Sequence, residues 1–209
     1  MRKDRTAMEK ILQYIRQKYA PLSIIVYGSY ADGSNHINSD FDALVISEHC
    51  AASHDAAQIG AVQLDVFVYP RSQFENGFDC REFFQIHDGI IVLDTDGFGA
   101  SIQSQVQNAL ELLPKKTPGE VRQEIAWCKK MLLRTERRSA EGLYRWHWLL
   151  TESLEIYCDA HKKTYLGPKK ALRWMEAEHP EAFRHYSRAL LHFDQQSLQS
   201  WISYLEKQS

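Results

Sequence analysis

The most restrictive feature of this chain is a change in its hydrophobic pattern close to Gly99. Before this residue, short runs rich in Val, Ile, Leu and aromatic residues predict strands at 22–27, 41–47 and 61–69. A shorter run at 90–93 predicts an edge strand. After Gly99 the apolar residues recur with a period of about 3.6, which predicts helices and no further strands.

Helices are expected both before and after these strands in the sequence. An amphipathic segment predicts a first helix at 4–19, and later segments predict helices at 100–113, 120–138 and 141–161, with three shorter ones up to residue 208. We therefore predict an α+β fold class, in which a small mixed β-sheet with flanking helices precedes an all-helical domain.

The boundary between the two domains is expected at a break in the helical pattern. Two prolines and a glycine interrupt the chain at 113–119, where Thr117, Pro118 and Glu120 form the pattern of a helix start. We place the domains at residues 1–114 and 115–209.

Composition excludes several classes of protein. The chain has 209 residues, 44% hydrophobic and 25% charged, and no apolar run approaches the ~20 residues that a membrane span needs. The start of the chain does not have the pattern of a secretory signal, and the four cysteines form no Cys-x-x-Cys pair. We expect free thiols and a cytoplasmic protein.

The charge is unevenly divided. Residues 1–114 carry 8 Lys and Arg against 15 Asp and Glu, a net charge of −7, whereas the rest carries 17 against 12, a net charge of +5. The first part therefore suits cations and the second suits anions. The overall charge of −2 argues against a protein that coats nucleic acid.

Gly28 and Ser29 follow the first predicted strand directly. A glycine lets the backbone approach a ligand without a Cβ clash, a serine offers a hydroxyl, and a following helical turn would direct N–H groups at an anion. This is the arrangement of a phosphate-binding loop. A plain turn after a strand has the same sequence pattern.

Three carboxylates lie on or beside the predicted strands. Alternation along the second strand places Asp40 and Asp42 on one face, where their charges repel unless a cation lies between them. Asp65 stands in an otherwise apolar strand, so we expect it to be buried and to need a metal or a hydrogen-bond donor. Hard oxygen ligands favour Mg²⁺. Two exposed acids on an edge strand are the alternative for Asp40 and Asp42.

Gly28-Ser29, then Asp40-Phe41-Asp42, then Asp65 in a later strand resemble the nucleotidyltransferase superfamily named for DNA polymerase β. Within it, the chain is most similar to the bacterial aminoglycoside and other antibiotic nucleotidyltransferases that carry a helical C-terminal domain. The motifs cover residues 24–69, and the remaining chain fits in outline only.

The resemblance implies roles for these five positions. Gly28 and Ser29 would hold the triphosphate, Asp40 and Asp42 would bridge two Mg²⁺ ions, and Asp65 would bind the ion that activates the acceptor hydroxyl. The co-substrate would be an NTP, with ATP expected. An intact Asp65 favours a working, metal-dependent enzyme over a module that only binds nucleotide.

Two groups in the helical part are further candidates. Lys169 stands at an expected helix start and would contact phosphate, with a plain surface lysine as the alternative. Glu152 or Glu155 would act as general base, as a glutamate of the helical domain does in some antibiotic-modifying relatives, unless Asp65 has that role. A helix that serves only core packing is the alternative for this segment.

The resemblance thus implies transfer of a nucleoside monophosphate, AMP expected, from Mg-NTP to a hydroxyl of a small-molecule acceptor such as an aminoglycoside, with release of pyrophosphate. Antibiotic resistance would be its biological setting. The alternative is an antitoxin-type protein adenylyltransferase that modifies a side chain of a partner protein. We expect no stable nucleic-acid partner and no membrane partner, and a homodimer is compatible with the sequence.

Overall fold

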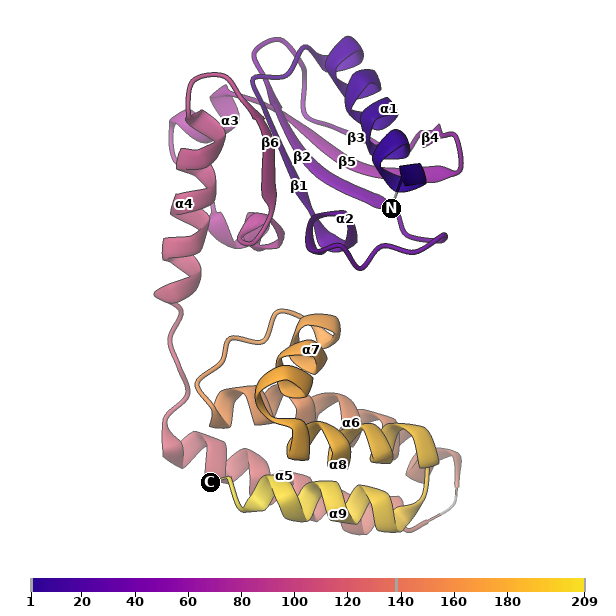
Figure 1. Ribbon diagram of the computed structural model, residues 1–209. Helices are drawn as coiled ribbons and strands as arrows, with labels where there is room; N and C mark the ends of the chain where they lie inside the picture. The colour runs from indigo at the N-terminus through magenta and orange to yellow at the C-terminus, as the bar shows by residue number, and fades with distance from the viewer. Residues whose placement is uncertain (1, 138, 209) are drawn as a thin grey trace. The chain divides into compact units, whose positions relative to one another are not determined.

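The computed structural model describes residues 2–137 and 139–208, and it consists of two compact units that divide between Leu113 and Pro114 (Figure 1). The first unit holds a mixed sheet with flanking helices, and the second holds helices. The predicted α+β fold class is confirmed. Within the described ranges, none of the helices combines the length and apolar character that crossing a membrane requires.

The sheet of the first unit contains all the strands predicted from the sequence. In the described residues it is six-stranded, in the order β3-β5-β2-β1-β6, with β4 paired to β5. Strand β1 runs antiparallel to β2 and β6, β3 and β4 run antiparallel to β5, and β2 and β5 are parallel. The strand bounds are β1 Ser23–Tyr27, β2 Phe41–Ser47, β3 Ser53–Asp55, β4 Gln58–Ile59, β5 Val62–Pro70 and β6 Ile90–Asp94. The predicted edge position of the last strand is confirmed.

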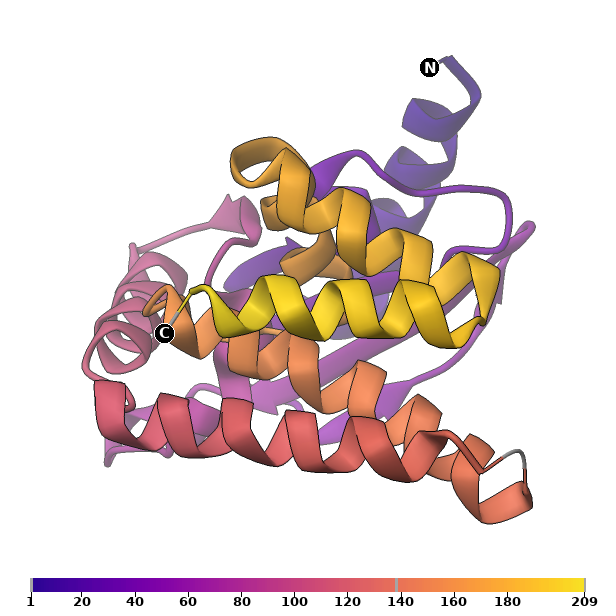
Figure 2. The same ribbon diagram turned by 90° about the horizontal axis from the view of Figure 1, so that it is seen from below.

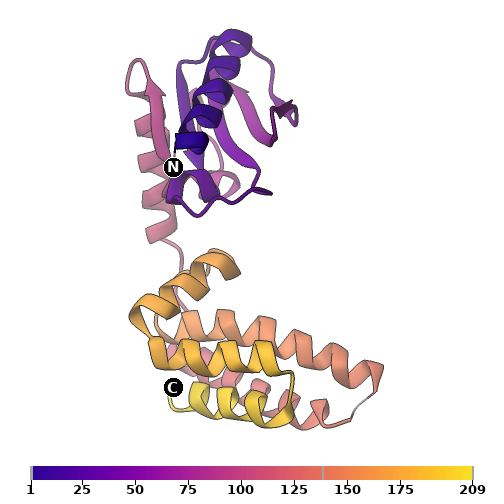
Figure 3. The same cartoon turned by 45° about the vertical axis from the view of Figure 1, so that its right-hand side comes forward.

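Helices cover both faces of this sheet (Figure 1). Helix α1 (Arg2–Tyr19) lies along one face, as Figure 3 also shows, where Ile11 and Ile15 pack against Ile24 and Val26 of β1. Helix α4 (Phe98–Glu111) packs with Ile25 and Tyr27 on the other face, together with α3 (Ser72–Glu75) and the 3₁₀ helix η1 (Cys80–Ile86). Burial on both faces explains why β1 is continuously apolar rather than alternating.

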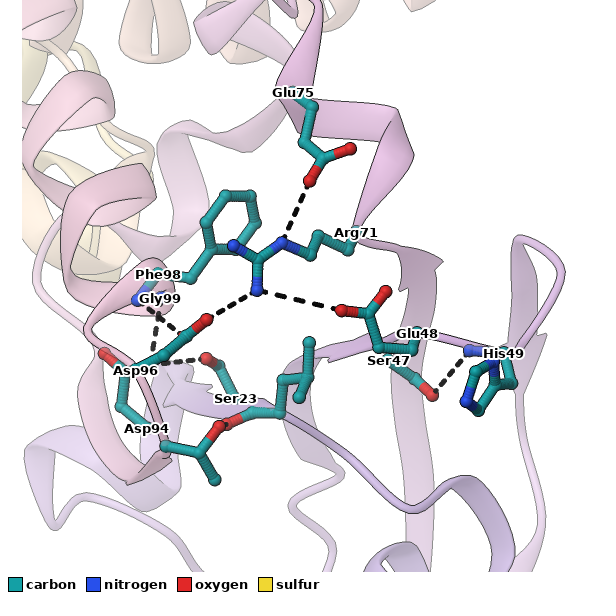
Figure 4. A network of polar contacts seen from close by, with 12 residues as sticks. Ser23, Ser47, Glu48, His49, Arg71, Glu75, Asp94, Asp96, Phe98 and Gly99 are labelled. Atoms are coloured by element: carbon teal, nitrogen blue, oxygen red, sulfur yellow. Dashed lines mark hydrogen bonds and ion pairs between the residues drawn. The ribbon is translucent and has the colours of Figure 1, made fainter.

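A polar network joins the ends of β2 and β5 to α3 and α4 (Figure 4). Arg71, directly after β5, donates to Glu75 and Asp96 and lies 3.8 Å from Glu48, which follows β2. Its guanidinium carbon is 4.4 Å from the centre of the Phe98 ring. These contacts help to hold the C-terminal ends of β2 and β5 side by side. The parallel register of the two strands also determines which residues are paired near their N-terminal ends.

The second unit is helical (Figure 2), and its buried side chains form a hydrophobic core of their own. Helices α5 and α6 pack together, α8 packs beside α9, and α9 also contacts α5. The buried indole of Trp201 donates from Nε1 to Ser153 Oγ at 2.8 Å. The helix bounds are α5 Pro118–Thr135, α6 Ala140–Ala160, α7 Pro168–Glu178, α8 Pro180–His192 and α9 Gln195–Glu206.

The start of α5 is the one predicted. Thr117 Oγ1 accepts from the backbone N–H of Glu120, and the Glu120 carboxylate accepts from the backbone N–H of Thr117. Pro118 occupies the first turn, where its missing N–H costs no helical hydrogen bond. This reciprocal cap confirms the predicted helix start.

Candidate functional site

The glycine after β1 lies against the carboxylate of Asp42. Helix α2 (Gly28–Asp32) begins directly at the end of β1, and Gly28 has φ +65°. A Cβ on Gly28 would lie 2.3 Å from Asp42 Oδ2. Only a glycine therefore permits this backbone conformation and leaves the carboxylate in place.

Ser29 follows inside the first turn and is buried. Its backbone carbonyl accepts from the N–H groups of Ser34 and Asn35, at 3.0 and 3.1 Å. These bonds close the loop behind α2, so the predicted phosphate-binding positions lie in an ordered turn next to Asp42.

Asp42 and Asp65 occupy paired positions on the parallel strands β2 and β5. Side chains at paired positions of neighbouring strands project from the same face of a sheet. Both carboxylates also lie near the hydroxyl of Tyr27. The pKa of Tyr27 is raised first by burial and then by the charges of Asp42 and Asp65. The structure therefore brings Gly28, Asp42 and Asp65 together.

Asp40 lies outside the paired strands that position Asp42 and Asp65. Strand β2 begins at Phe41, so Asp40 lies before the strand and is exposed. The alternation that predicts Asp40 and Asp42 on one face therefore does not reach Asp40. Within residues 2–137 and 139–208, no three His, Cys, Asp or Glu side chains form a group that would hold a metal ion. The joint site of Asp40, Asp42 and Asp65 stays a prediction.

The expectation that Asp65 is buried is wrong, because its side chain is 42% exposed. Burial alternates along β5: Leu64, Val66 and Val68 pack in the core under α1, whereas Asp65 projects from the opposite face. Its apolar sequence neighbours thus cover the other side of the strand. Asp65 does have a hydrogen-bond partner, but in an open position.

That partner is His54, a residue that the sequence pattern does not indicate. His54 Nε2 lies 2.6 Å from Asp65 Oδ1, and the imidazole stacks on Phe67 with a centroid distance of 4.6 Å and an interplanar angle of 23°. His54 comes from β3, which has only three residues and no apolar alternation. The sequence of β3 therefore carries no signal that distinguishes it from a loop.

A buried carboxylate anchors β3 beside His54. Asp55 accepts hydrogen bonds from Tyr14, Lys18 and Tyr19 of α1, at 3.0, 2.9 and 2.6 Å, and from the backbone N–H of Ala57. Burial by itself would raise the pKa of Asp55, but these donors outweigh it and lower the pKa to about 2. Asp55 is therefore ionised and ties β3 to α1.

The donor chemistry of Asp42 and Asp65 suits the divalent cation that the resemblance implies. Asp42 and Asp65 present carboxylate oxygens from paired positions, and such hard oxygen donors suit Mg²⁺. Gly28 adds no side chain that would fill the space beside Asp42 Oδ2. Asp40 is close in sequence and would complete the set.

The other predicted residues lie in the second unit. Lys169 is an exposed residue in the first turn of α7. Glu152 and Glu155 of α6 line a pocket of about 250 Å³, together with Lys116, Glu124, Trp127, Trp148 and Ile156.

Like charges are crowded at this pocket. The pKa of Glu155 is raised, first by partial burial and then by the neighbouring Asp159 carboxylate. Lys116 is the cation of the group and bridges Glu124 and Asp159, at 2.6 and 2.9 Å. Trp127 and Trp148 meet edge to face, with ring centres 5.2 Å apart. The pocket is thus acidic with an aromatic wall.

Comparison with known proteins finds a family match within the first unit. Residues 8–95 match the family model of the nucleotidyltransferase domain, a span that runs from α1 to the loop after β6. No curated protein matches the chain. A crystal structure of a nucleotidyltransferase-like protein from Exiguobacterium sibiricum shares 13% sequence identity, with coverage of 96% of this chain and 74% of the other, at a TM-score of 0.39. That structural likeness is too low to support a functional statement.

Proposed function

We propose that this protein transfers a nucleoside monophosphate, with AMP expected, from an NTP to a hydroxyl of a small-molecule acceptor that carries amino groups, such as an aminoglycoside. The proposal rests on one observation above all: Asp42 and Asp65 are paired across β2 and β5 beside Gly28, inside the segment that matches a nucleotidyltransferase domain.

The reaction is a substitution at the α-phosphorus. The acceptor oxygen forms a bond to the α-phosphorus, the bond from that phosphorus to the bridging oxygen of the β-phosphate breaks, and pyrophosphate leaves. The hydroxyl proton passes to a general base, for which Asp65, Glu152 and Glu155 remain the candidates. Positioning of the two reactants and electrostatic stabilisation provide most of the rate in phosphoryl transfer.

The chain's own residues divide this work. Gly28 and Ser29 would hold the triphosphate, because a glycine lets the protein backbone approach a ligand without a Cβ clash. Asp40, Asp42 and Asp65 would hold divalent cations, which when bound offset phosphate charge and lower the pKa of the acceptor hydroxyl. Asp65 is open to solvent and hence accessible to an acceptor.

The second unit supports the choice of an amine-bearing acceptor. Its pocket combines the carboxylates of Glu152 and Glu155 with the rings of Trp127 and Trp148, whereas Glu124 is already paired with Lys116. Carboxylates pair with ammonium groups, and tryptophan rings bind cations over their faces. An acceptor with several amino groups would satisfy both.

The test is a screen for pyrophosphate release with each NTP and Mg²⁺ against aminoglycosides, lincosamides and cell extract, with mass spectrometry of the products. We expect transfer to an amine-bearing small molecule. Asp42→Asn should lower the rate about 100-fold or more, because a carboxylate that would hold the divalent cations is lost. Glu111→Gln, which removes an exposed carboxylate of the same unit, is the control and should retain the rate.

Two results would contradict the proposal. Transfer of AMP to a protein of the extract, with no small molecule modified, would identify the protein-modifying alternative. Full activity of Asp42→Asn would remove the assigned site.

A further inference from the structure

The contact between His54 and Asp65 gives this site a residue that neither the motif nor the family match assigns. We infer that His54 is a positioning residue, which holds the Asp65 carboxylate in the orientation that nucleotidyl transfer needs. The inference rests on the proposed function and extends it to a residue outside the predicted set.

The geometry fixes both partners. His54 pairs with Phe67 across β3 and β5, so Asp65 is its diagonal neighbour on the same face of the sheet. Stacking on Phe67 sets the plane of the imidazole, and Nε2 then lies 2.6 Å from Asp65 Oδ1. A carboxylate with one oxygen bound in this way keeps its second oxygen for another ligand.

Stability does not explain the contact. The side chains of His54 and Asp65 are 47% and 42% exposed, and solvent-exposed pairs contribute little to folding. A short bond at an open position instead restricts the rotation of the Asp65 side chain. In metal sites, hydrogen bonds of this kind orient the ligand, and their loss commonly lowers metal affinity or activity 10- to 100-fold.

The position of His54 does not depend on Asp65. The next residue, Asp55, is buried and bound by Tyr14, Lys18 and Tyr19 of α1. Alternation along β3 directs Asp55 toward α1 and His54 toward the face that carries Asp65. Helix α1 therefore holds the strand, and the strand holds the imidazole against the carboxylate.

The experiment compares His54→Ala with His54→Gln, whose side-chain amide can still donate to Asp65. The control is His49→Ala, which removes an exposed histidine of the same unit. For each full-length variant we would measure the melting temperature, kcat, the KM for NTP, and Mn²⁺ affinity by electron paramagnetic resonance in the presence of a non-hydrolysable NTP.

His54→Ala should lower kcat and weaken Mn²⁺ binding by about 10-fold or more, with the KM for NTP and the melting temperature close to those of the unmodified protein. His54→Gln should recover most of both losses. In an Asp65→Asn background, His54→Ala should weaken Mn²⁺ binding no further, because the group it positions is already altered.

Wild-type kcat and Mn²⁺ affinity in His54→Ala would overturn the inference, and so would a His54→Gln variant as impaired as His54→Ala. Failure of the proposed function gives a different result. The unmodified protein would then transfer no nucleotide, while Mn²⁺ binding would still report whether His54 acts through Asp65.

Discussion

At the scale of single residues, the site depends on Gly28 having no Cβ atom. Gly28 has φ +65°, and a Cβ there would meet Asp42 Oδ2 at 2.3 Å. Gly60 has the same φ, +65°, but a Cβ there would have no heavy atom within 4 Å. The two glycines thus share a backbone requirement, and Gly28 alone of the pair has the additional contact with a carboxylate.

This comparison predicts the effect of two substitutions. Gly60→Ala should cost about 1–2 kcal/mol of the free energy of unfolding, from backbone strain alone, and should leave transfer activity intact. Gly28→Ala should cost more and lower the transfer rate about 10-fold or more, because the new methyl group displaces Asp42. Urea unfolding and pyrophosphate release measure the two effects. Equal behaviour of the two variants would mean that the approach of Gly28 to Asp42 has no functional role.

At the scale of elements, the short strand β3 connects the site to helix α1. It supplies His54 to Asp65 on one face and Asp55 to α1 on the other. Its three residues would not form a strand in isolation, because so short a segment has little intrinsic preference for one. Pairing with β5 and the buried carboxylate of Asp55 hold it in place.

This anchor predicts a pH dependence. The folded pKa of Asp55 is about 2, below the ordinary value of 3.8, so its contribution is fully present above pH 3.8 and is lost as the pH falls through 2. Asp55→Asn should therefore lower the free energy of unfolding by about 2 kcal/mol at pH 7, and the difference from the unmodified protein should shrink between pH 4 and pH 2. Urea unfolding at a series of pH values measures it.

Asp79 provides a matched control for this prediction. The pKa of its carboxyl is also lowered to about 2, in this case by hydrogen bonds from Arg81, but Asp79 is exposed. Asp79→Asn should therefore change stability much less than Asp55→Asn. A stability difference for Asp55→Asn that persisted undiminished at pH 2 would contradict the assignment of its effect to the ionised carboxylate.

At the scale of the whole molecule, charge and chemistry are divided between two units. The net charge of −7 in residues 1–114 belongs to the part that carries Asp42 and Asp65, and the +5 of the remainder belongs to the part that carries Lys169. A triphosphate is negatively charged, and so are the Asp42 and Asp65 carboxylates near Gly28, so cations have to offset their repulsion. We propose that Lys169 supplies part of that compensation.

The proposed role of Lys169 is testable by its removal. Lys169→Ala should raise the KM for NTP or lower kcat about 10-fold, because a charge-assisted contact with phosphate is lost. Lys130→Ala, an exposed lysine of α5, is the control and should leave both constants unchanged. Steady-state kinetics with varied NTP measure the effect, and unchanged constants for Lys169→Ala would remove the residue from the site.

Local pattern determined most of the architecture. The apolar runs predicted β1, β2, β5 and β6, and Thr117 with Glu120 predicted the start of α5, because periodicity and capping act within a few neighbouring residues. The predicted strand positions of Asp42 and Asp65 were enough to show the resemblance to a known motif. These features are properties of short segments and can be read without the rest of the chain.

Tertiary structure decided what those residues touch. The exposure of Asp65 depends on what covers its face of β5, and no residue near it in sequence determines that. His54 meets Asp65 only because β3, a polar segment without periodicity, pairs with β5 and is tied by Asp55 to a helix 36 to 41 residues away in sequence. Contacts between distant segments arise from the packing of the whole unit, so they become visible only when the chain has folded.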